Sequence, residues 1–281
     1  MRPCPAMPRP HRAGSRGVTL VELMVAVTLG LLIVVVLAQL FLGSRQTFAT
    51  TDDVSRMQDN IRYSQQLLTR IVHLAGYKSQ ANSVTSTVFS GNPPLDAPSP
   101  LPTGATPDAL TVRFQGSGIK KDYGGVNCQA VANCDGADGT VVDCLGVKID
   151  AGVIATNTFS IAAGANGRLA LFCHNGAGAM PGVEIVPDVL NMQVLYGEDL
   201  NGDLVADRYV GPETVGTNIG SVVSVRIALL FETPTESSRA VADAAQKYDM
   251  LRDGTVLVGP FTDRRMRRVV ATTINLRNRT P

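Results

Sequence analysis

Near its N-terminus the chain carries a long run of apolar residues. Residues 23–44 read LMVAVTLGLLIVVVLAQLFLGS, a stretch of 22 residues without a charge. At about 1.5 Å per residue, a helix of this length crosses the ~30 Å hydrocarbon core of a bilayer. A secretory signal peptide has a shorter apolar region of about 7–15 residues that ends in a small-residue cleavage site, and no such site closes this run. The pattern therefore predicts a membrane-spanning helix.

The charges around this run predict its orientation. The first 17 residues contain Arg2, Arg9, Arg12 and Arg16, and no further arginine occurs before Arg45. Basic residues collect on the cytoplasmic side of membrane helices. We therefore expect a cytoplasmic N-terminus, an inner-membrane helix and a periplasmic remainder. An uncleaved single-pass anchor is one protein class that fits this pattern.

Beyond the membrane run, apolar residues recur at heptad spacing. The two positions of the heptad are occupied by Val54, Ile61, Leu68 and Ala75, and by Met57, Ser64 and Ile71. One stripe of this helix can therefore pack on a sheet while charged residues face water. The water-facing set is Asp52, Asp53, Arg56, Asp59 and Arg62. Gly76 is a natural helix stop. A coiled-coil dimer is the alternative, but three heptads are short for one.

The rest of the chain has the pattern of an antiparallel sheet. Residues 92–107 form a Pro-rich stretch that we expect to be a surface loop. Strand-like runs follow at residues 109–114, 140–149, 168–173, 189–196, 222–231, 255–258 and 268–276. Asp253 and Gly254 predict a hairpin turn. Successive strands without intervening helices indicate an α+β fold, in which the long helix packs on an antiparallel sheet.

The charge of the body argues against a nucleic-acid binder. Of 25 basic residues, four lie in the leader, and the remaining 21 stand against 24 acidic residues, so the chain after Gly17 carries a net charge of −3. Nucleic-acid binding needs clustered positive charge. The densest basic run is Arg264, Arg265, Arg267 and Arg268. We interpret it as a solvated edge strand, or as a face that meets an acidic neighbour, rather than as a DNA site.

Four of the five cysteines fall in one exported region. Cys128, Cys134, Cys144 and Cys173 lie within 46 residues, whereas Cys4 is in the basic leader. An even number of cysteines in an oxidising compartment predicts two disulfides, with three connectivities open. A zinc site is the alternative. It is disfavoured because no Cys-x2-Cys pair exists and only His174 lies nearby.

A carboxylate stands at the mouth of the apolar run. Glu22 follows Gly17 and Val18 within RGVTLVELMVAVTLG. A charged side chain in a membrane helix costs about 2.5–3.5 kcal/mol and needs a partner. The stretch resembles the prepilin signature. That resemblance implies cleavage after Gly17 by a prepilin peptidase, methylation of the new N-terminus at Val18, and pairing of Glu22 with the α-amino group of a neighbouring subunit. The family usually has Phe at the first mature position. Either Met1 or Met7 can be the start.

Three later stretches resemble the PilW family of minor pilins. They are NMQVLYGEDLNGDLVADRY at residues 191–209, SVRIALLF at residues 224–231 and RRVVATTINLRNR at residues 267–279. The resemblance implies a type IV pilin-like fold with four parts. These are a cleaved basic leader (1–17), a transmembrane assembly helix (18–43), an amphipathic helix continuing into the head (44–76) and a periplasmic β-rich head (77–281).

The first of these stretches contains a calcium-like pattern. Asp199, Asn201, Asp203 and Asp207 place side-chain oxygens at positions 1, 3, 5 and 9 of one loop. Position six is Leu204 instead of Gly, and position twelve is Gly211 instead of Glu. We expect no required cofactor, and weak calcium binding is one hypothesis. An ordinary acidic turn is the other.

No enzyme motif is present. The chain lacks G-x-S-x-G, a P-loop and H-E-x-x-H. The sequence favours a minor pilin of a type IV pilus priming or tip complex, whose partners are other minor pilins, the major pilin, the prepilin peptidase and the inner membrane, with no nucleic acid. The resemblance implies roles in adhesion, twitching motility or DNA uptake. A J-type pseudopilin of type II secretion and a membrane-anchored calcium-dependent adhesin or binding module are the alternatives.

Overall fold

The structure is a computed structural model that describes residues 17–78, 95–96, 106–117, 139–150, 153–176, 179–236, 246–251 and 256–278. The chain divides into two compact units. The N-terminal unit is Met1–Thr50 and the head is Thr51–Pro281. Cys128, Cys134 and the predicted Asp253–Gly254 turn lie outside the described residues.

Helix α1 (Leu20–His73) is the longest element of the protein. It forms because residues 20–73 contain no proline and the only glycines, Gly30 and Gly43, are isolated among good helix formers. Within the described residues, α1 is the one helix long and apolar enough to cross a membrane, and none of its apolar window is buried. The predicted membrane-capable helix is therefore present.

The part of α1 that belongs to the head confirms the predicted stripe. Its buried residues are Met57, Ile61, Ser64, Leu67, Leu68, Ile71 and Val72. Leu67 and Val72 were not in the predicted heptad, and they widen the stripe because a straight helix of 3.6 residues per turn drifts from a strict heptad. The helix ends before Gly76, which has φ of 75°. This left-handed residue turns the chain so that its N–H reaches the carbonyl of Arg113 at 3.0 Å.

One sheet of the head is a five-stranded antiparallel meander. Its strands are β1 (Leu95–Asp96), β2 (Leu110–Gln115), β3 (Ile154–Ala163), β4 (Leu169–His174) and β5 (Val183–Pro187), in the order β1-β2-β3-β4-β5. Strand β1 corrects the prediction that residues 92–107 are entirely a surface loop. Leu95 is buried and pairs with Val112 of β2.

A second sheet has four antiparallel strands. They are β6 (Val189–Glu198), β7 (Arg208–Val210), β8 (Val222–Glu232) and β11 (Arg267–Asn275), in the order β11-β8-β6-β7. The short helices α2 (Pro212–Val215) and η1 (Gly216–Ser221) connect β7 to β8. Strands β9 (Tyr248–Asp249) and β10 (Leu257–Val258) form a small two-stranded sheet. The prediction of a single sheet is therefore wrong. The prediction of an α+β class with antiparallel strands is confirmed.

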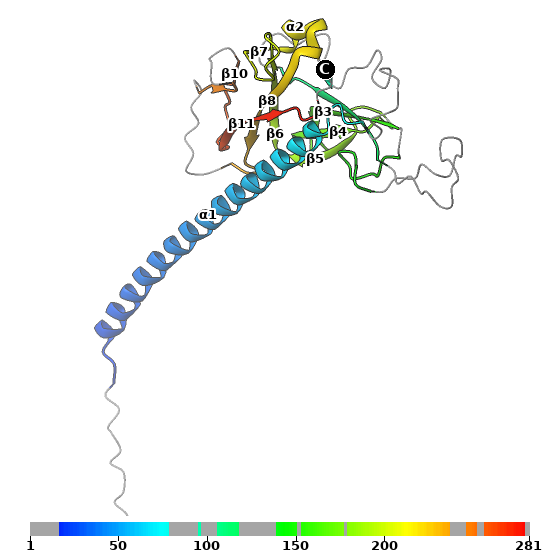
Figure 1. Ribbon diagram of the computed structural model, residues 1–281. Helices are drawn as coiled ribbons and strands as arrows, with labels where there is room; N and C mark the ends of the chain where they lie inside the picture. The colour runs from blue at the N-terminus through cyan, green and yellow to red at the C-terminus, as the bar shows by residue number, and fades with distance from the viewer. Residues whose placement is uncertain are drawn as a thin grey trace, which may run out of the picture. The chain divides into compact units, whose positions relative to one another are not determined.

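Asp188 explains why the chain divides between two sheets. It is the one residue between β5 and β6, and its φ of 61° is rare for a residue with a side chain. The turn there ends one sheet and starts the next. Both sheets and the end of α1 share one core, which includes Ile71, Phe159 and Tyr196. Figure 1 shows this end of α1 among the labelled strands.

One predicted strand was wrong, and one long strand was not predicted. Residues 140–149 were expected to form a strand, but they form a tight turn with one bridge, Val142 to Lys148. The side chain of Asp143 causes it, because Oδ1 accepts the N–H groups of Leu145 and Val147, both at 2.8 Å. Strand β3 was missed because IATNTFSIAA has only three large apolar residues, Ile154, Phe159 and Ile161, among Ala, Thr, Ser and Asn.

Candidate assembly site

The start of α1 is closed by a capping box. Thr19 precedes the helix, and its Oγ1 accepts the backbone N–H of Glu22 at 3.3 Å. In return, Oε2 of Glu22 accepts the backbone N–H of Thr19 at 3.4 Å and its hydroxyl at 3.3 Å. This is the reciprocal S/T-x-x-E arrangement that satisfies free N–H groups at a helix start. Glu22 therefore has a local role that the sequence analysis did not recognise.

The carboxylate of Glu22 is also exposed, so that a positively charged group can approach it at the start of α1. Its carboxylate lies in the first turn of α1, where the helix dipole stabilises negative charge. Gly17 and Val18 precede the helix and are exposed, and no atom lies within 4 Å of a Cβ built on Gly17. The predicted cleavage residues are thus on an open, non-helical segment. Cleavage, methylation and pairing of Glu22 with a neighbour stay predictions.

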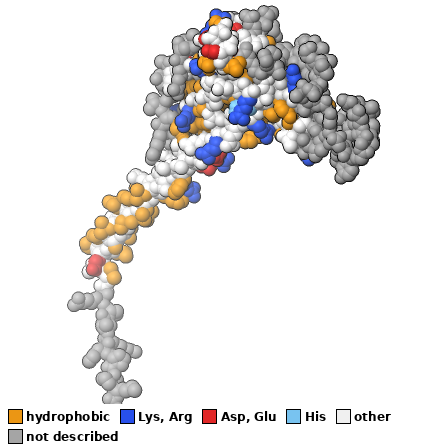
Figure 2. All heavy atoms as spheres, in the orientation of Figure 1, with side chains coloured by type: hydrophobic (Ala, Val, Ile, Leu, Met, Phe, Trp, Pro, Cys, Tyr) orange, Lys and Arg blue, Asp and Glu red, His pale blue; other side chains and the backbone are white. Residues whose placement is uncertain are grey.

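The helix that follows presents apolar side chains on every face. On the face that Figure 2 shows, hydrophobic side chains lie along the length of this part of α1. Leu40, for example, is 65% exposed. A helix that is apolar all round is typical of a membrane span or of a helix buried among others. This surface is the part of the N-terminal unit that can be held by lipid or by neighbouring helices.

The stretch at residues 267–279 attaches the head sheet to α1. Thr272 of β11 accepts a hydrogen bond from Nε2 of Gln65 at 2.8 Å. Asn278 donates from Nδ2 to the carbonyl of His73 at 2.8 Å, at the end of α1. Two polar residues of this stretch therefore hold the helix against the edge strand of the four-stranded sheet.

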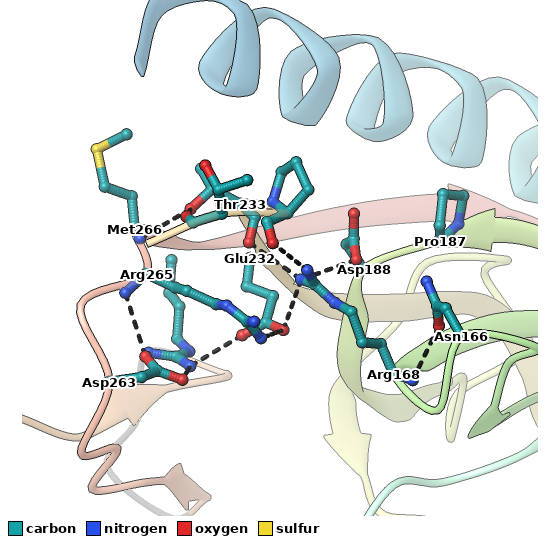
Figure 3. Close-up of polar contacts among 12 residues, drawn as sticks. Asn166, Arg168, Pro187, Asp188, Glu232, Thr233, Asp263, Arg265 and Met266 are labelled. Carbon is teal, nitrogen blue, oxygen red and sulfur yellow. Dashed lines mark hydrogen bonds and ion pairs between the residues drawn. The ribbon is translucent and has the colours of Figure 1, made fainter. Parts of the chain in front are cut away.

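Arg267, the first residue of that stretch, is buried in an ion cluster. Its side chain is 3% exposed and lies 2.8 Å from Glu232 and 2.7 Å from Asp263. Glu232 also pairs with Arg168 at 2.9 Å and Arg265 at 3.1 Å. Figure 3 shows Arg168 and Arg265 beside Glu232, with Arg168 near Asp188 as well. The cluster joins Asp188, where the chain passes from β5 to β6, to the ends of β8 and β11.

The cluster corrects the interpretation of the basic run. Strand β11 is an edge strand, as predicted, but Arg267 is not solvated. The hydrogen bond from Arg267 lowers the pKa of Asp263 although partial burial opposes the shift. Burial raises the pKa of Asp188, and the charge of Arg168 opposes that effect. Burial lowers the pKa of Arg267, but Asp263 and Glu232 outweigh it, so that the pKa is raised overall.

The stretch at residues 191–209 packs tightly against β8. Tyr196 is fully buried, and a Cβ at Gly197 would collide with the side chains of Ser224 and Ala206. Glu198 is also buried, and its Oε2 lies 2.7 Å from Nε of Arg208. Sequence reasoning missed Glu198 because an acid at a strand end looks like a surface residue. Glu198 and Arg208 are ten residues apart, and this spacing does not match a pattern, such as i, i+4 on a helix, that would predict an ion pair.

The predicted calcium loop is ordered by its own side chains. Asp199 accepts the N–H of Gly202 at 2.6 Å through Oδ1 and the N–H of Leu204 at 3.0 Å through Oδ2. Asn201 contacts Asp203 at 3.2 Å and Asp207 at 3.4 Å. The four predicted ligands are therefore close together. Among the described residues, however, no three His, Cys, Asp or Glu side chains form a group that could hold a metal ion.

A protein-family model matches part of the head. Residues 158–278 match the family model described as PilW, Type IV Pilus-assembly protein W. The chain is PilW-like over these residues. The match includes the stretches at residues 191–209 and 224–231 and all but the last residue of the stretch at 267–279, so the sequence resemblance is confirmed. It supports a type IV pilus-related, pilin-like protein.

The chain is also similar to solved structures, of which one is a pilin. The type IV-like pilin TTHA1219 from Thermus thermophilus shares 16% identity with it, at a TM-score of 0.41. The alignment covers 80% of this chain and 100% of that one. No curated protein gives a significant match.

One disulfide of the head is present among the described residues. Cys144 pairs with Cys173, with their Cα atoms 6.4 Å apart, a separation that is ordinary for a disulfide. The bond ties the turn of residues 139–150 to strand β4. It selects one of the three connectivities that the sequence left open. A second bond, Cys128 to Cys134, stays a prediction.

Proposed function

We propose that the protein is a minor pilin of the PilW type in a Gram-negative inner membrane. The leader is removed after Gly17, and the mature chain starts at Val18. The observation that carries this proposal is the pairing of an all-apolar helix, which begins at the Thr19–Glu22 capping box, with a head that matches the PilW family over residues 158–278.

The proposed mechanism is transfer of the helix from lipid to a fibre core. In the membrane, lipid covers the apolar side chains of α1. In the fibre, apolar helices of neighbouring subunits replace the lipid. Glu22 sets the register, because in a low-dielectric core its carboxylate attracts the α-amino group of an adjacent subunit strongly. Together with other minor pilins and the major pilin, the protein then forms the complex that primes pilus assembly or stands at the pilus tip.

The test compares two glycines of the same leader. In a host with prepilin peptidase, mass spectrometry of the membrane-extracted protein should find a mature N-terminus at Val18. Gly17→Leu should retain the leader, whereas Gly14→Leu, the matched change three residues earlier, should be processed normally. An intact start at Met1 or Met7 in the unmodified protein would refute the prepilin assignment.

A second measurement separates a fibre subunit from an anchored module. Pili sheared from cells that express a tagged copy should contain the processed protein. Complete retention in the membrane fraction of piliated cells would contradict the fibre role. It would favour a plain anchored adhesin or binding module.

A further inference from the structure

A cavity lies at the C-terminal end of α1, in the head. Its volume is about 360 Å³, within the ~300–1,000 Å³ of typical binding pockets. Leu74, Tyr77 and Val142 give it apolar walls, and Arg70, His73 and Arg277 add basic groups. The cavity thus has apolar walls with basic side chains around them. Neither the PilW match nor the pilin likeness assigns it a role.

The positive charge of this cavity is carried by two exposed arginines. Arg70 contacts a backbone carbonyl, that of Asp143, at 3.4 Å. Within the described part of the chain, no carboxylate forms an ion pair with Arg70 or Arg277. Burial and the nearby Arg277 lower the pKa of His73, so the imidazole adds little charge at neutral pH. The cavity therefore favours an occupant with an apolar tip and carboxylates beside it.

The loop after β6 has this chemistry. Leu200, Leu204 and Val205 are 62%, 69% and 63% exposed, and they alternate with Asp203 and Asp207. Leu204 has φ of 67°, which costs about 1–2 kcal/mol for a residue with a Cβ. Strained residues with exposed apolar side chains are a feature of binding segments. The hydrogen bond from the N–H of Leu204 to Asp199 holds this side chain in its outward position.

The cavity and the loop lie near opposite edges of the four-stranded sheet. The loop lies between β6 and β7, and β7 is one edge of the four-stranded sheet. Arg277 and Asn278 of the cavity follow β11, which is the opposite edge. The three apolar side chains of the loop are exposed in this chain, so its own cavity does not bury them.

We propose that the cavity receives the residue 199–207 loop of a second copy of this chain. Leu204 and Val205 enter the apolar hollow, and Asp203 or Asp207 pairs with Arg70 and Arg277. Because loop and cavity are different surfaces, the contact is heterologous and leaves one loop and one cavity free at the two ends of each pair. Contacts of this type extend helical assemblies. The proposal rests on the proposed function for its setting, a pilin assembly.

The test is photo-cross-linking of the full-length protein in its own membrane. One tagged copy carries photoreactive benzoylphenylalanine in place of Leu204, and a second copy with a different tag is the acceptor. A cross-link between the two tags should map by mass spectrometry to residues 70–77 or 277–278 of the acceptor. Arg277→Glu and, separately, Arg70→Glu in the acceptor should lower the yield about tenfold. Arg268→Glu, the same change at an exposed residue of β11, should leave it unchanged.

Three outcomes would overturn the proposal. They are a cross-link to a different pilin, a cross-link within one copy, and a yield that Arg277→Glu and Arg70→Glu do not change. Fractionation of the same cells tests the proposed function separately. Protein in sheared fibres without the cross-link contradicts the docking contact alone. The cross-link in membranes of piliated cells whose fibres lack the protein contradicts the minor pilin role alone.

Discussion

The side chain of Asn278 donates a hydrogen bond to the backbone carbonyl of His73, with the nitrogen and oxygen 2.8 Å apart. His73 is the last residue of α1, where carbonyl groups have no partner within the helix. Asn278 follows β11 and is 205 residues further along the chain. Asn278, near the C-terminus, thus caps the C-terminal end of α1.

Replacing Asn278 with Ala should lower the free energy of unfolding by about 1 kcal/mol, because the carbonyl of His73 loses its partner. The measurement is a denaturant melt of the full-length protein in detergent. Asn275→Ala is the control, since Asn275 is an exposed residue of the same strand end. Equal stability of the Asn278 variant and the unmodified protein would contradict the capping role.

Two substitutions of Glu22 separate its local hydrogen bonds from its charge. Glu22→Gln keeps a capping-box acceptor but removes the charge, whereas Glu22→Ala removes both. Both variants should insert and be cleaved, because loss of the charge eases insertion by about 2.5–3.5 kcal/mol. We expect both to be missing from sheared pili in a strain without the native copy. If Glu22→Gln enters pili normally, the helix cap matters and the charge does not.

Asp263 should make the head sensitive to acid. Its folded pKa is below the ordinary value of 3.8, first because Arg267 donates hydrogen bonds to it. A lowered folded pKa means that the stabilisation is complete above pH 3.8 and is lost as the pH falls through the folded value. Asp263→Asn should therefore reduce stability at neutral pH and flatten its decline below pH 3.8. Parallel melting curves of variant and unmodified protein across that range would contradict this assignment.

The Cys144–Cys173 disulfide leaves Cys128 and Cys134 as the remaining two cysteines of the head. Since Cys144 bonds Cys173, we expect Cys128 to bond Cys134. A thiol reagent should then find none of these four free in the oxidised, processed protein. Cys144→Ser should destabilise the head by about 2–4 kcal/mol, because the unfolded chain is less restricted. Free thiols at Cys128 and Cys134 in the oxidised, processed protein would disprove the second bond.

Calcium binding to the residue 199–207 loop remains a prediction with a clear test. We expect affinity on the order of 10⁻⁴ to 10⁻³ M, as in extracellular modules, so millimolar calcium should raise the melting temperature by mass action. Asp203→Ala should abolish that increase. Asp199→Ala should destabilise the protein in chelator as well, because Asp199 holds backbone N–H groups of the loop. Identical melts in calcium and in chelator would leave an ordinary acidic turn.

The sequence alone determined the features that depend on local pattern. The apolar run and the residue 54–75 stripe predicted the long helix and its buried face, since helix periodicity is a property of neighbouring residues. Five predicted strands, including β6, β8 and β11, lie close to their observed bounds for the same reason. The PilW resemblance likewise came from contiguous stretches, and the match over residues 158–278 confirms it.

Only the tertiary structure decided what distant residues do together. The division into two sheets depends on a left-handed Asp188, and no local pattern requires that conformation of an Asp. The ion cluster around Glu232 gathers arginines from positions 168, 265 and 267, so an apparent surface run contains a buried residue. Burial and pairing of charge are set by which strands become neighbours. That choice depends on the packing of the whole core, which a reading of consecutive residues does not contain.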